Sequence, residues 1–438
     1  MCAFAMSAKP SEKAVSKDGP PSCSTKQHQE SADVLTVFLT GNELGELKPC
    51  GCSGGQLGGL DRRAAIFNGV PALKRMIIST GSFVKSNGDQ DQIKFDIMIQ
   101  AHDLLGYDLL NLTERDIEIA RNLGLLAGLH NVISSHKPAD VNIPAKFTKQ
   151  LSLKKAVVAV TVAALDTESG KIEHVRELFD SPRGVQTVNI LIVNHCDERI
   201  VGPIAEMAIV DCLVCPAESD EAMVSDYLNK RPLVVSVGRF GRYVGRLQIS
   251  AAEGEDRLKL SFLPVPLTED LPREKSLVEL YKTYQQIVKM ENLLEKQPRF
   301  ILPDGLEYAG SESCKACHEY AYEKWSTKAH ARAYATLEKE GTQYDPECIV
   351  CHVVGYTYQS GFVSEDKTGH LKNVGCENCH GPGSKHNQYP LLEKTTEPKS
   401  KCTDCHTPEH SANYAGNEKS YLEKIVHWRE PKAASNVK

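Results

Sequence analysis

The feature that most constrains this chain is the pattern C-x-x-C-H, which occurs four times in its last third. In each copy two residues separate a pair of cysteines, and a histidine directly follows the second cysteine. C-x-x-C-H is the attachment signature of c-type haem. The two thiols add to the vinyl groups of one porphyrin, and the adjacent imidazole reaches the iron as the proximal ligand. The copies occupy residues 314–318, 348–352, 376–380 and 402–406.

Zinc ribbons and disulfide frameworks also use closely spaced cysteines, but neither requires a histidine after every second cysteine. Four such copies within residues 314–406 therefore favour four covalent c-type haems. The predicted thioether residues are Cys314, Cys317, Cys348, Cys351, Cys376, Cys379, Cys402 and Cys405. The predicted proximal iron ligands are His318, His352, His380 and His406.

The second axial position of a c-type haem is usually taken by His or Met. No methionine lies beyond Met290, so His/Met ligation is disfavoured in this region. Two filled axial positions favour an electron carrier, whereas an open position would indicate chemistry at the iron. Each histidine outside the motifs is either a distal ligand or an ordinary surface residue. The candidate distal ligands are His330, His370, His386, His410 and His427.

Polar residues, Gly and Pro fill the spaces between these motifs, and long apolar periodic runs are missing. Four porphyrins would supply the apolar bulk of residues 304–438. We therefore expect a mostly α, loop-rich multihaem domain that needs its cofactor to fold. A helix is predicted over residues 320–340, and another is predicted to begin at 391–394.

Residues 314–333 and 374–386 resemble the first and third haem segments of the cytochrome c-554/c-prime family, and residues 405–411 and 424–427 resemble its closing segment. In that family, histidines after a Trp-containing helix and after Gly-Pro-Gly serve as distal ligands. The resemblance implies those roles for His330 and His386. Some members of the family have one five-coordinate haem, so the resemblance leaves open whether an iron is accessible here.

From Val34 onward, short apolar strands alternate with helical patterns, which predicts an α/β layered sandwich over residues 34–266. A helical linker follows over 267–303, because apolar residues recur at helical spacing within 274–296. The expected strands cover 34–39, 75–78, 109–112, 131–134, 156–161, 188–193, 212–214, 233–237 and 244–249. The expected helices cover 56–67, 95–105, 114–126, 201–207 and 221–229.

Residues 106–112 and 234–247 resemble segments of the 5′-nucleotidase branch of metallophosphoesterases. Such enzymes use two metals at strand ends to polarise phosphate and activate water. The resemblance implies a metallophosphoesterase-like fold that is degenerate, because most ligand positions carry other residues. These positions are 40–45, 81–82, 113–114 and 215–218, and only His195 keeps a ligand type. A two-metal phosphatase site is therefore not expected.

Four cysteines of this domain fall near predicted strand ends: Cys50, Cys52, Cys212 and Cys215. One or two disulfides are the first interpretation in an exported protein. The alternative is an additional metal or redox site. Its residues would be Cys50, Cys52, His195 and Cys215.

Two neighbouring features leave further alternatives. Cys196 has no C-x-x-C partner and is expected to be a small buried side chain. The Gly-rich run that ends at Arg62 and Arg63 can hold a small anion at a helix start, or it is a turn with solvent-facing arginines.

Residues 1–33 are rich in Ser, Lys, Pro and Gln, which predicts a disordered leader or tether. They contain no adequate apolar signal segment, although covalent haem attachment requires export. A net charge of −6 gives no reason to expect nucleic acid as a partner. No apolar run reaches the roughly 18 residues of a transmembrane helix.

The sequence thus predicts a periplasmic or otherwise extracytoplasmic cytochrome that transfers electrons to and from redox partner proteins. Its N-terminal domain would dock partners or bind a small anion. One alternative is an oxidoreductase that acts on a small nitrogen or sulfur oxyanion at an open-site haem. The other, a phosphate-ester hydrolase, is disfavoured because the metal ligands are missing.

Overall fold

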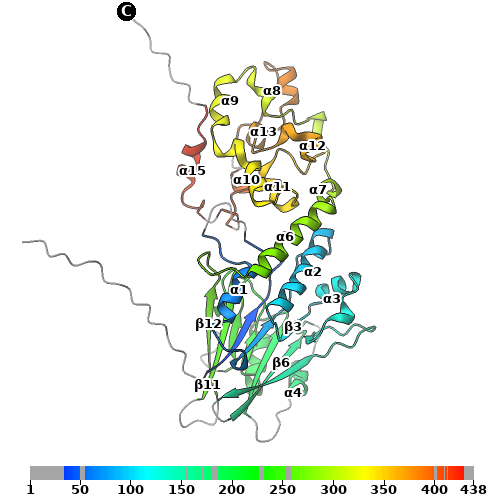
Figure 1. Ribbon diagram of the computed structural model, residues 1–438, viewed down its shortest axis with the longest axis vertical. Helices are drawn as coiled ribbons and strands as arrows, with labels where there is room; N and C mark the ends of the chain where they lie inside the picture. The colour runs from blue at the N-terminus through cyan, green and yellow to red at the C-terminus, as the bar shows by residue number, and fades with distance from the viewer. Residues whose placement is uncertain are drawn as a thin grey trace, which may run out of the picture.

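The computed structural model describes residues 34–49, 55–153, 156–168, 172–179, 186–225, 231–251, 258–398, 402–408, 410–411 and 413–428. Two six-stranded sheets with flanking helices form the N-terminal part, and short helices joined by loops form the C-terminal part (Figure 1). The predicted leader, Cys50 and Cys52 lie outside the described residues. No helix in the described ranges is both long and apolar enough to cross a membrane.

The first sheet has the strand order β12-β11-β1-β2-β3-β4. Strands β1 to β4 run parallel. Strand β11 pairs antiparallel with β1, and β12 pairs antiparallel with β11. The bounds are β1 Val34–Thr40, β2 Arg75–Ser79, β3 Leu109–Asn111, β4 Val132–Ile133, β11 Tyr243–Ala251 and β12 Leu258–Pro266.

The second sheet has the order β5-β6-β7-β8-β10-β9, with a parallel centre of β6, β7, β8 and β10. Its two edge strands, β5 and β9, pair antiparallel. The bounds are β5 Lys146–Leu153, β6 Ala156–Leu165, β7 Gln186–Val193, β8 Cys212–Val214, β9 Met223–Val224 and β10 Leu233–Ser236.

The two sheets pack face to face, because side chains alternate between the two faces of each strand. In β1, Val37 joins a buried cluster that also includes Val160 of the second sheet. Its neighbour Phe38 joins the cluster on the opposite face, beneath the helices of the first sheet. A third cluster lies between the second sheet and its own helices. The N-terminal part is therefore a four-layer α-β-β-α sandwich, and the predicted layered α/β architecture is confirmed.

Helices α1, α2 and α3, together with the linker helix α6, cover the first sheet, and α4 and α5 cover the second. The capping residue of α3 is Thr113, whose hydroxyl accepts a hydrogen bond from the backbone N–H of Asp116. The bounds are α1 Leu60–Phe67, α2 Asp89–Leu104, α3 Glu114–Asn122, α4 Val175–Leu178 and α5 Glu198–Met207.

The helix expected over 274–296 forms as two pieces, α6 (Lys275–Met290) and α7 (Leu293–Lys296). Asn292 separates them in a left-handed conformation, with φ of 51°. Helix α6 packs along α2 and leads from the sandwich toward the C-terminal part (Figure 1). Leu294 of α7 belongs to the small apolar cluster of that part.

The C-terminal part is mostly α and rich in loops, as predicted. Its apolar cluster contains few buried side chains, among them Tyr334, Ile349 and Phe362. The bounds are α8 Ser311–Lys315, α9 Glu319–Ser326, α10 Ala333–Glu340, α11 Pro346–His352, α12 Glu365–Thr368, α13 Cys376–His380, α14 Ser384–Gln388 and α15 Glu418–Ile425.

Three local predictions were wrong. The helix expected over 221–229 is replaced at its described end by the edge strand β9, because tertiary pairing with β10 overrides the local pattern. The helix expected over 320–340 is divided into α9, a 3-10 helix at Ala329–Arg332, and α10. Residues 391–394 start no helix, since Leu391 and Leu392 are exposed in a turn and have no core to pack against.

Candidate haem-binding site

Each C-x-x-C-H motif occupies about one helical turn. Cys348–His352 and Cys376–His380 lie within α11 and α13, whereas Cys314 lies near the end of α8 and Cys402 begins a 3-10 helix. A helical turn places positions i and i+3 on one face. The two thiols of each motif therefore emerge from the same side, and the histidine follows them at i+4. In the first motif the backbone N–H of His318 donates to the Cys314 carbonyl at 2.9 Å.

The motif cysteines meet across motifs in two places. Cys314 and Cys376 are hydrogen-bonded through their side chains, and so are Cys351 and Cys405. The first contact raises the pKa of the Cys314 thiol and lowers that of Cys376 to about 7. Attachment points of motifs one and three are thus adjacent, as are those of motifs two and four.

Three of the four predicted proximal histidines each have the ring of a histidine from outside the motifs nearby. An iron between two imidazole nitrogens, at about 2 Å from each as in other metal–imidazole bonds, would separate the ring centroids by roughly 6 Å. All three observed spacings fit a haem iron ligated on both sides. The centroid separations are 6.2 Å for His318 and His386, 6.3 Å for His406 and His330, and 6.4 Å for His380 and His427.

Hydrogen bonds orient several of these rings. A metal-binding histidine commonly donates its second ring N–H to a carbonyl, which fixes the tautomer and directs the other nitrogen at the metal. In each case below Nδ1 is the nitrogen engaged, so a haem iron would bind at Nε2. The acceptors are the carbonyl of Ala333 for His352 (2.7 Å), of Glu393 for His386 (2.8 Å) and of Ile425 for His427 (2.9 Å). His406 Nδ1 is hydrogen-bonded to the Ser411 hydroxyl at 3.0 Å.

Burial favours the neutral form of these rings. Desolvation lowers the pKa of His352 and of His406 below the ordinary value of 6.5. Desolvation also lowers the pKa of His330, and the neighbouring His406 adds to the effect. Only a neutral imidazole can ligate a metal, so these environments match iron binding.

A hollow lies at the third motif. Both of its cysteines, its proximal His380 and the facing His427 line this hollow, so all four predicted contacts of one haem surround a single space. The indole N–H of Trp325 donates to the Val374 carbonyl at 3.0 Å and fixes one wall. The remaining lining residues are Lys328, His330, Gly375 and Ile425.

The other two candidate distal ligands lie elsewhere in the region. His370 lies in a 3-10 helix after α12, and a Cβ added to Gly310 would come within 2.9 Å of its ring. His410 Nδ1 is 2.8 Å from the Thr407 hydroxyl. The three ring pairs described above involve motifs one, three and four.

Glu377 is a residue of this region that sequence reasoning missed. Its buried carboxylate, 4% exposed, accepts hydrogen bonds from the backbone N–H groups of Ala309, Gly310 and Gly383 at 2.7–2.9 Å. It therefore ties the chain before the first motif to the loop before His386. Its place inside the third motif was the available signal, but burial cannot be read from that position.

In the sandwich, the structure corrects one expectation for the cysteines. Cys196 forms a disulfide with Cys215, and the bond joins the loops after β7 and β8. Cys196 is thus half-buried and paired, because two parallel strands bring these loops together. Cys212 is buried, and desolvation raises its thiol pKa.

The predicted second site is only partly described. In this structure Cys215 has no free thiol to offer a metal. His195 is exposed, with Nε2 3.5 Å from an Asp197 carboxylate oxygen. Among the described residues, no three His, Cys, Asp or Glu side chains are grouped as a metal site.

A buried ion pair lies at the carboxyl end of β1, the edge where open α/β sheets place their sites. Arg63 Nη2 is 2.8 Å from Glu43 Oε1, and both side chains are at most 1% exposed. Arg63 also donates to the Tyr107 hydroxyl at 2.8 Å. Burial lowers the pKa of Arg63, but Tyr107 and Glu43 more than offset this and raise it overall.

The neighbouring Arg62 also has partners within the chain. Its Nη1 donates to the carbonyls of Gln56, Gly58 and Leu267 at 2.9–3.2 Å. Both guanidinium groups of the Gly-rich run are therefore hydrogen-bonded internally. The alternative of solvent-facing arginines was wrong for Arg63, which is buried.

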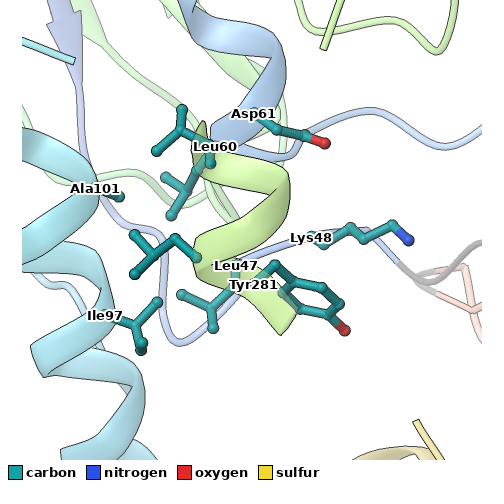
Figure 2. Close-up of a pocket in the computed structure, with 9 residues that line it drawn as sticks. Leu47, Lys48, Leu60, Asp61, Ile97, Ala101 and Tyr281 are labelled. Atoms are coloured by element: carbon teal, nitrogen blue, oxygen red, sulfur yellow. The ribbon is translucent and has the colours of Figure 1, made fainter. Parts of the chain in front are cut away.

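A second hollow lies between α1, α2 and α6, and Figure 2 shows side chains that line it. Its walls are mainly apolar side chains, whereas the carboxylate of Asp61 and the amine of Lys48 point away from it. No set of polar groups converges on this space, so it suggests no chemistry. It is lined by Leu47, Lys48, Leu60, Asp61, Ile97, Ala101, Leu277, Leu280 and Tyr281.

Residues 313–381 match the family described as cytochrome c554 and c-prime. This part of the chain is similar to cytochrome c554. A curated relative, cytochrome c-554 of Nitrosomonas europaea, is 33% identical over 91 residues. The match covers 17% of this chain and 39% of that relative, so more than half of the cytochrome c-554 lies outside it.

The N-terminal part has weak similarity to solved phosphoesterase structures. YfkN of Bacillus subtilis, a calcineurin-like phosphoesterase, has a TM-score of 0.43 at 12% identity, over 58% of this chain and 97% of that one. A 5′-nucleotidase precursor from Thermus thermophilus has a TM-score of 0.43 at 17% identity, over 61% of each chain.

Proposed function

We propose that this protein is a c-type cytochrome that transfers electrons through four covalently bound haems. The main support is the set of three histidine pairs, each with a spacing that suits an iron between the rings. The similarity of residues 313–381 to cytochrome c554 supports a haem-binding, electron-carrying role for the same segment. When bound, a haem supplies reversible one-electron chemistry at its iron.

The side chains of the region would hold and orient these haems. The eight motif cysteines would form the thioether bonds, and His318, His352, His380 and His406 the proximal bonds. His386, His427 and His330 would be the distal ligands of motifs one, three and four. Hydrogen bonds at Nδ1 hold the rings in place, and a fixed ligand set reduces the rearrangement that accompanies each electron transfer.

The rest of the chain would serve this module. We assign residues 34–266 to a sandwich domain that docks redox partner proteins, 267–303 to a linker and 304–438 to the haem domain. The internal hydrogen bonds of Arg62 and Arg63 argue against anion binding at the Gly-rich run, which leaves docking as the proposed role. An extracytoplasmic location follows from the haem attachment, which takes place outside the cytoplasmic membrane.

The proposal is tested on protein from a haem-maturing host. A pyridine haemochrome spectrum with intact mass should give four haems per chain. Electron paramagnetic resonance should show low-spin irons for the three paired motifs. A colourless protein with free motif thiols, or with zinc bound to them, would overturn the proposal.

Carbon monoxide distinguishes the carrier from an enzyme with an open iron. A carrier in which all four irons have two axial ligands forms no carbon monoxide adduct in the reduced state. A high-spin signal with turnover of nitrite, hydroxylamine or sulfite would instead support the oxyanion enzyme. Assays with added manganese or zinc should detect no phosphatase activity. Robust activity would contradict our account of the missing metal ligands.

A further inference from the structure

The sandwich reaches the haem region through a buried polar cluster at the start of α11. Gln90 of α2 donates from Nε2 to Asp345 Oδ1 and to the Tyr284 hydroxyl, each at 2.8 Å. Tyr284 of α6 donates in turn to Asp345 Oδ2 at 2.8 Å. Asp345 is the capping residue of α11 and accepts from the backbone N–H of Glu347. Two helices of the sandwich side therefore hold the first turn of a helix that carries a haem motif.

An ion pair completes this cluster. Lys94, one helical turn after Gln90, places Nζ 2.5 Å from Glu347 Oε2. The Lys94 side chain is 4% exposed and that of Glu347 is 46% exposed. Asp345 and Glu46 also act on the ammonium group. Desolvation opposes the charge on Lys94, but these carboxylates outweigh it and raise its pKa.

The cluster adjoins the second haem motif. Glu347 immediately precedes Cys348, and α11 continues through Cys351 to His352. At the far end of this helix, His352 Nδ1 lies 2.7 Å from the Ala333 carbonyl oxygen. Helix α11 is thus held at one end by the sandwich and at the other by the haem region. A buried charge at its first turn acts on this motif through a medium that screens poorly.

We propose that Lys94 is a positioning residue for the haem attached through Cys348 and Cys351, and that its buried charge sets the reduction potential of that haem. The inference depends on the proposed function, since it requires a haem at the second motif. It gives the sandwich a defined effect on electron transfer: one of its own side chains adjusts one of the four potentials.

The sign of the effect follows from electrostatics. A positive charge stabilises the reduced haem, which carries one more electron, and a negative charge stabilises the oxidised form. Lys94→Met removes one positive charge beside the second motif, so the potential of the second haem should fall. Glu347→Gln removes one negative charge there, so the potential of that haem should rise. The double variant removes both charges and should return most of the way to the original value.

The experiment is a spectroelectrochemical titration of the four-haem protein and these three variants. Each single variant should change the reduction equilibrium of one haem at least about threefold, which corresponds to roughly 28 mV at 59 mV per decade. Lys94→Met should have the larger effect, because Lys94 is the more buried partner. Lys282→Met is the matched control, since Lys282 forms an exposed pair with Glu279 on α6 and should shift nothing.

A Cys348→Ala/Cys351→Ala chain identifies the haem that responds, because the Lys94 substitution should move no potential in it. The inference would be overturned by potential shifts of the same sign in both single variants. It would also be overturned by equal shifts in all haems, or by unchanged potentials. If the Lys94→Met variant does not fold, the expected rise in the potential of the second haem in Glu347→Gln becomes the deciding measurement. Mass spectrometry of the parent chain separates the two proposals: a missing haem at Cys348 and Cys351 contradicts the four-haem function, whereas four haems with unmoved potentials contradict only this inference.

Discussion

Glu377 shows how a single side chain can organise the haem region. It lies between the two cysteines of the third motif, yet its carboxylate is turned inward to three backbone N–H groups. Buried donors that lose their acceptor each cost about 1–3 kcal/mol. One carboxylate therefore holds both the segment that precedes the first motif and the loop that precedes His386.

Replacing Glu377 with Ala should lower stability and disturb ligation at the first motif. Three N–H groups lose their acceptor, so we expect at least about 2 kcal/mol of destabilisation and a weaker low-spin signal from one haem. Thermal unfolding and electron paramagnetic resonance measure the two effects. Glu307→Ala, at an exposed position in the same segment, serves as the control. An unchanged spectrum in Glu377→Ala would contradict this role.

His102 gives the sandwich a pH-dependent stability. Its ring is 1% exposed, packs against Phe83 and Tyr107, and has no hydrogen-bond partner at either nitrogen. Desolvation, with the charge of Arg63, lowers its pKa well below 6.5. The folded chain thus keeps this ring neutral at a pH where the unfolded chain protonates it.

The free energy of unfolding should therefore fall as the pH drops below about 6.5, because the unfolded state binds the extra proton. Above that pH the contribution is fully present. His102→Phe should flatten the profile between about pH 6.5 and 5, as measured by denaturant titrations at each pH. His130→Gln, on an exposed histidine, should leave the slope unchanged. An unaltered slope in His102→Phe would rule out this assignment.

At the scale of elements, continuous apolar strands were easier to predict than half-exposed antiparallel edge strands. The nine expected strands all form, because a continuous apolar run such as that of β6 can be recognised in the sequence without knowledge of the neighbouring strands. The three missed strands, β5, β9 and β12, are antiparallel edge strands with exposed side chains. Edge strands depend on a partner rather than on local composition, so their sequences alone did not mark them.

The break between α6 and α7 is another element-scale feature that periodicity did not predict. Apolar spacing continues through it, but Asn292 is left-handed and turns the chain so that Leu293 and Leu294 are buried in different clusters. Asn tolerates this conformation better than residues with longer or branched side chains. A straight helix would carry the second leucine away from the haem-region core.

Asn292→Gly should keep or slightly raise the stability of the protein, and Asn292→Val should lower it by about 1–2 kcal/mol, since a β-branched residue is strained at positive φ. Chemical denaturation of the haem-loaded protein measures both. Met290→Val, at an exposed position with ordinary helical geometry, controls for helix propensity. Equal effects of the two Asn292 substitutions would show that the bend does not require a left-handed residue.

On the scale of the whole molecule, apolar burial is unevenly distributed. The sandwich has three extensive clusters, whereas the C-terminal part has one small cluster around Tyr334 and Phe362. A small core cannot offset the conformational entropy of so many loop residues. The sandwich should therefore be stable without haem, and the C-terminal part should not.

Protein made in a host without haem maturation tests this difference. Limited proteolysis should digest the chain beyond about residue 304 and leave a resistant fragment that contains both sheets. Circular dichroism should show strand signal with a cooperative transition, and loss of helix relative to the haem-loaded protein. Equal protease resistance of the C-terminal part with and without haem would refute the uneven division of stability.

The sequence by itself predicted the chemistry of attachment, because a thioether-bound haem needs two cysteines and a histidine within one helical turn, and such a pattern is local. It also determined the alternating order of strands and helices, since each element carries its own apolar period. Only the tertiary structure decided which histidine faces which, how Cys196 meets Cys215, and that Lys94 reaches the helix of the second motif. Those contacts join residues far apart in the chain, and packing of the sheets and helices, rather than local composition, brings them together.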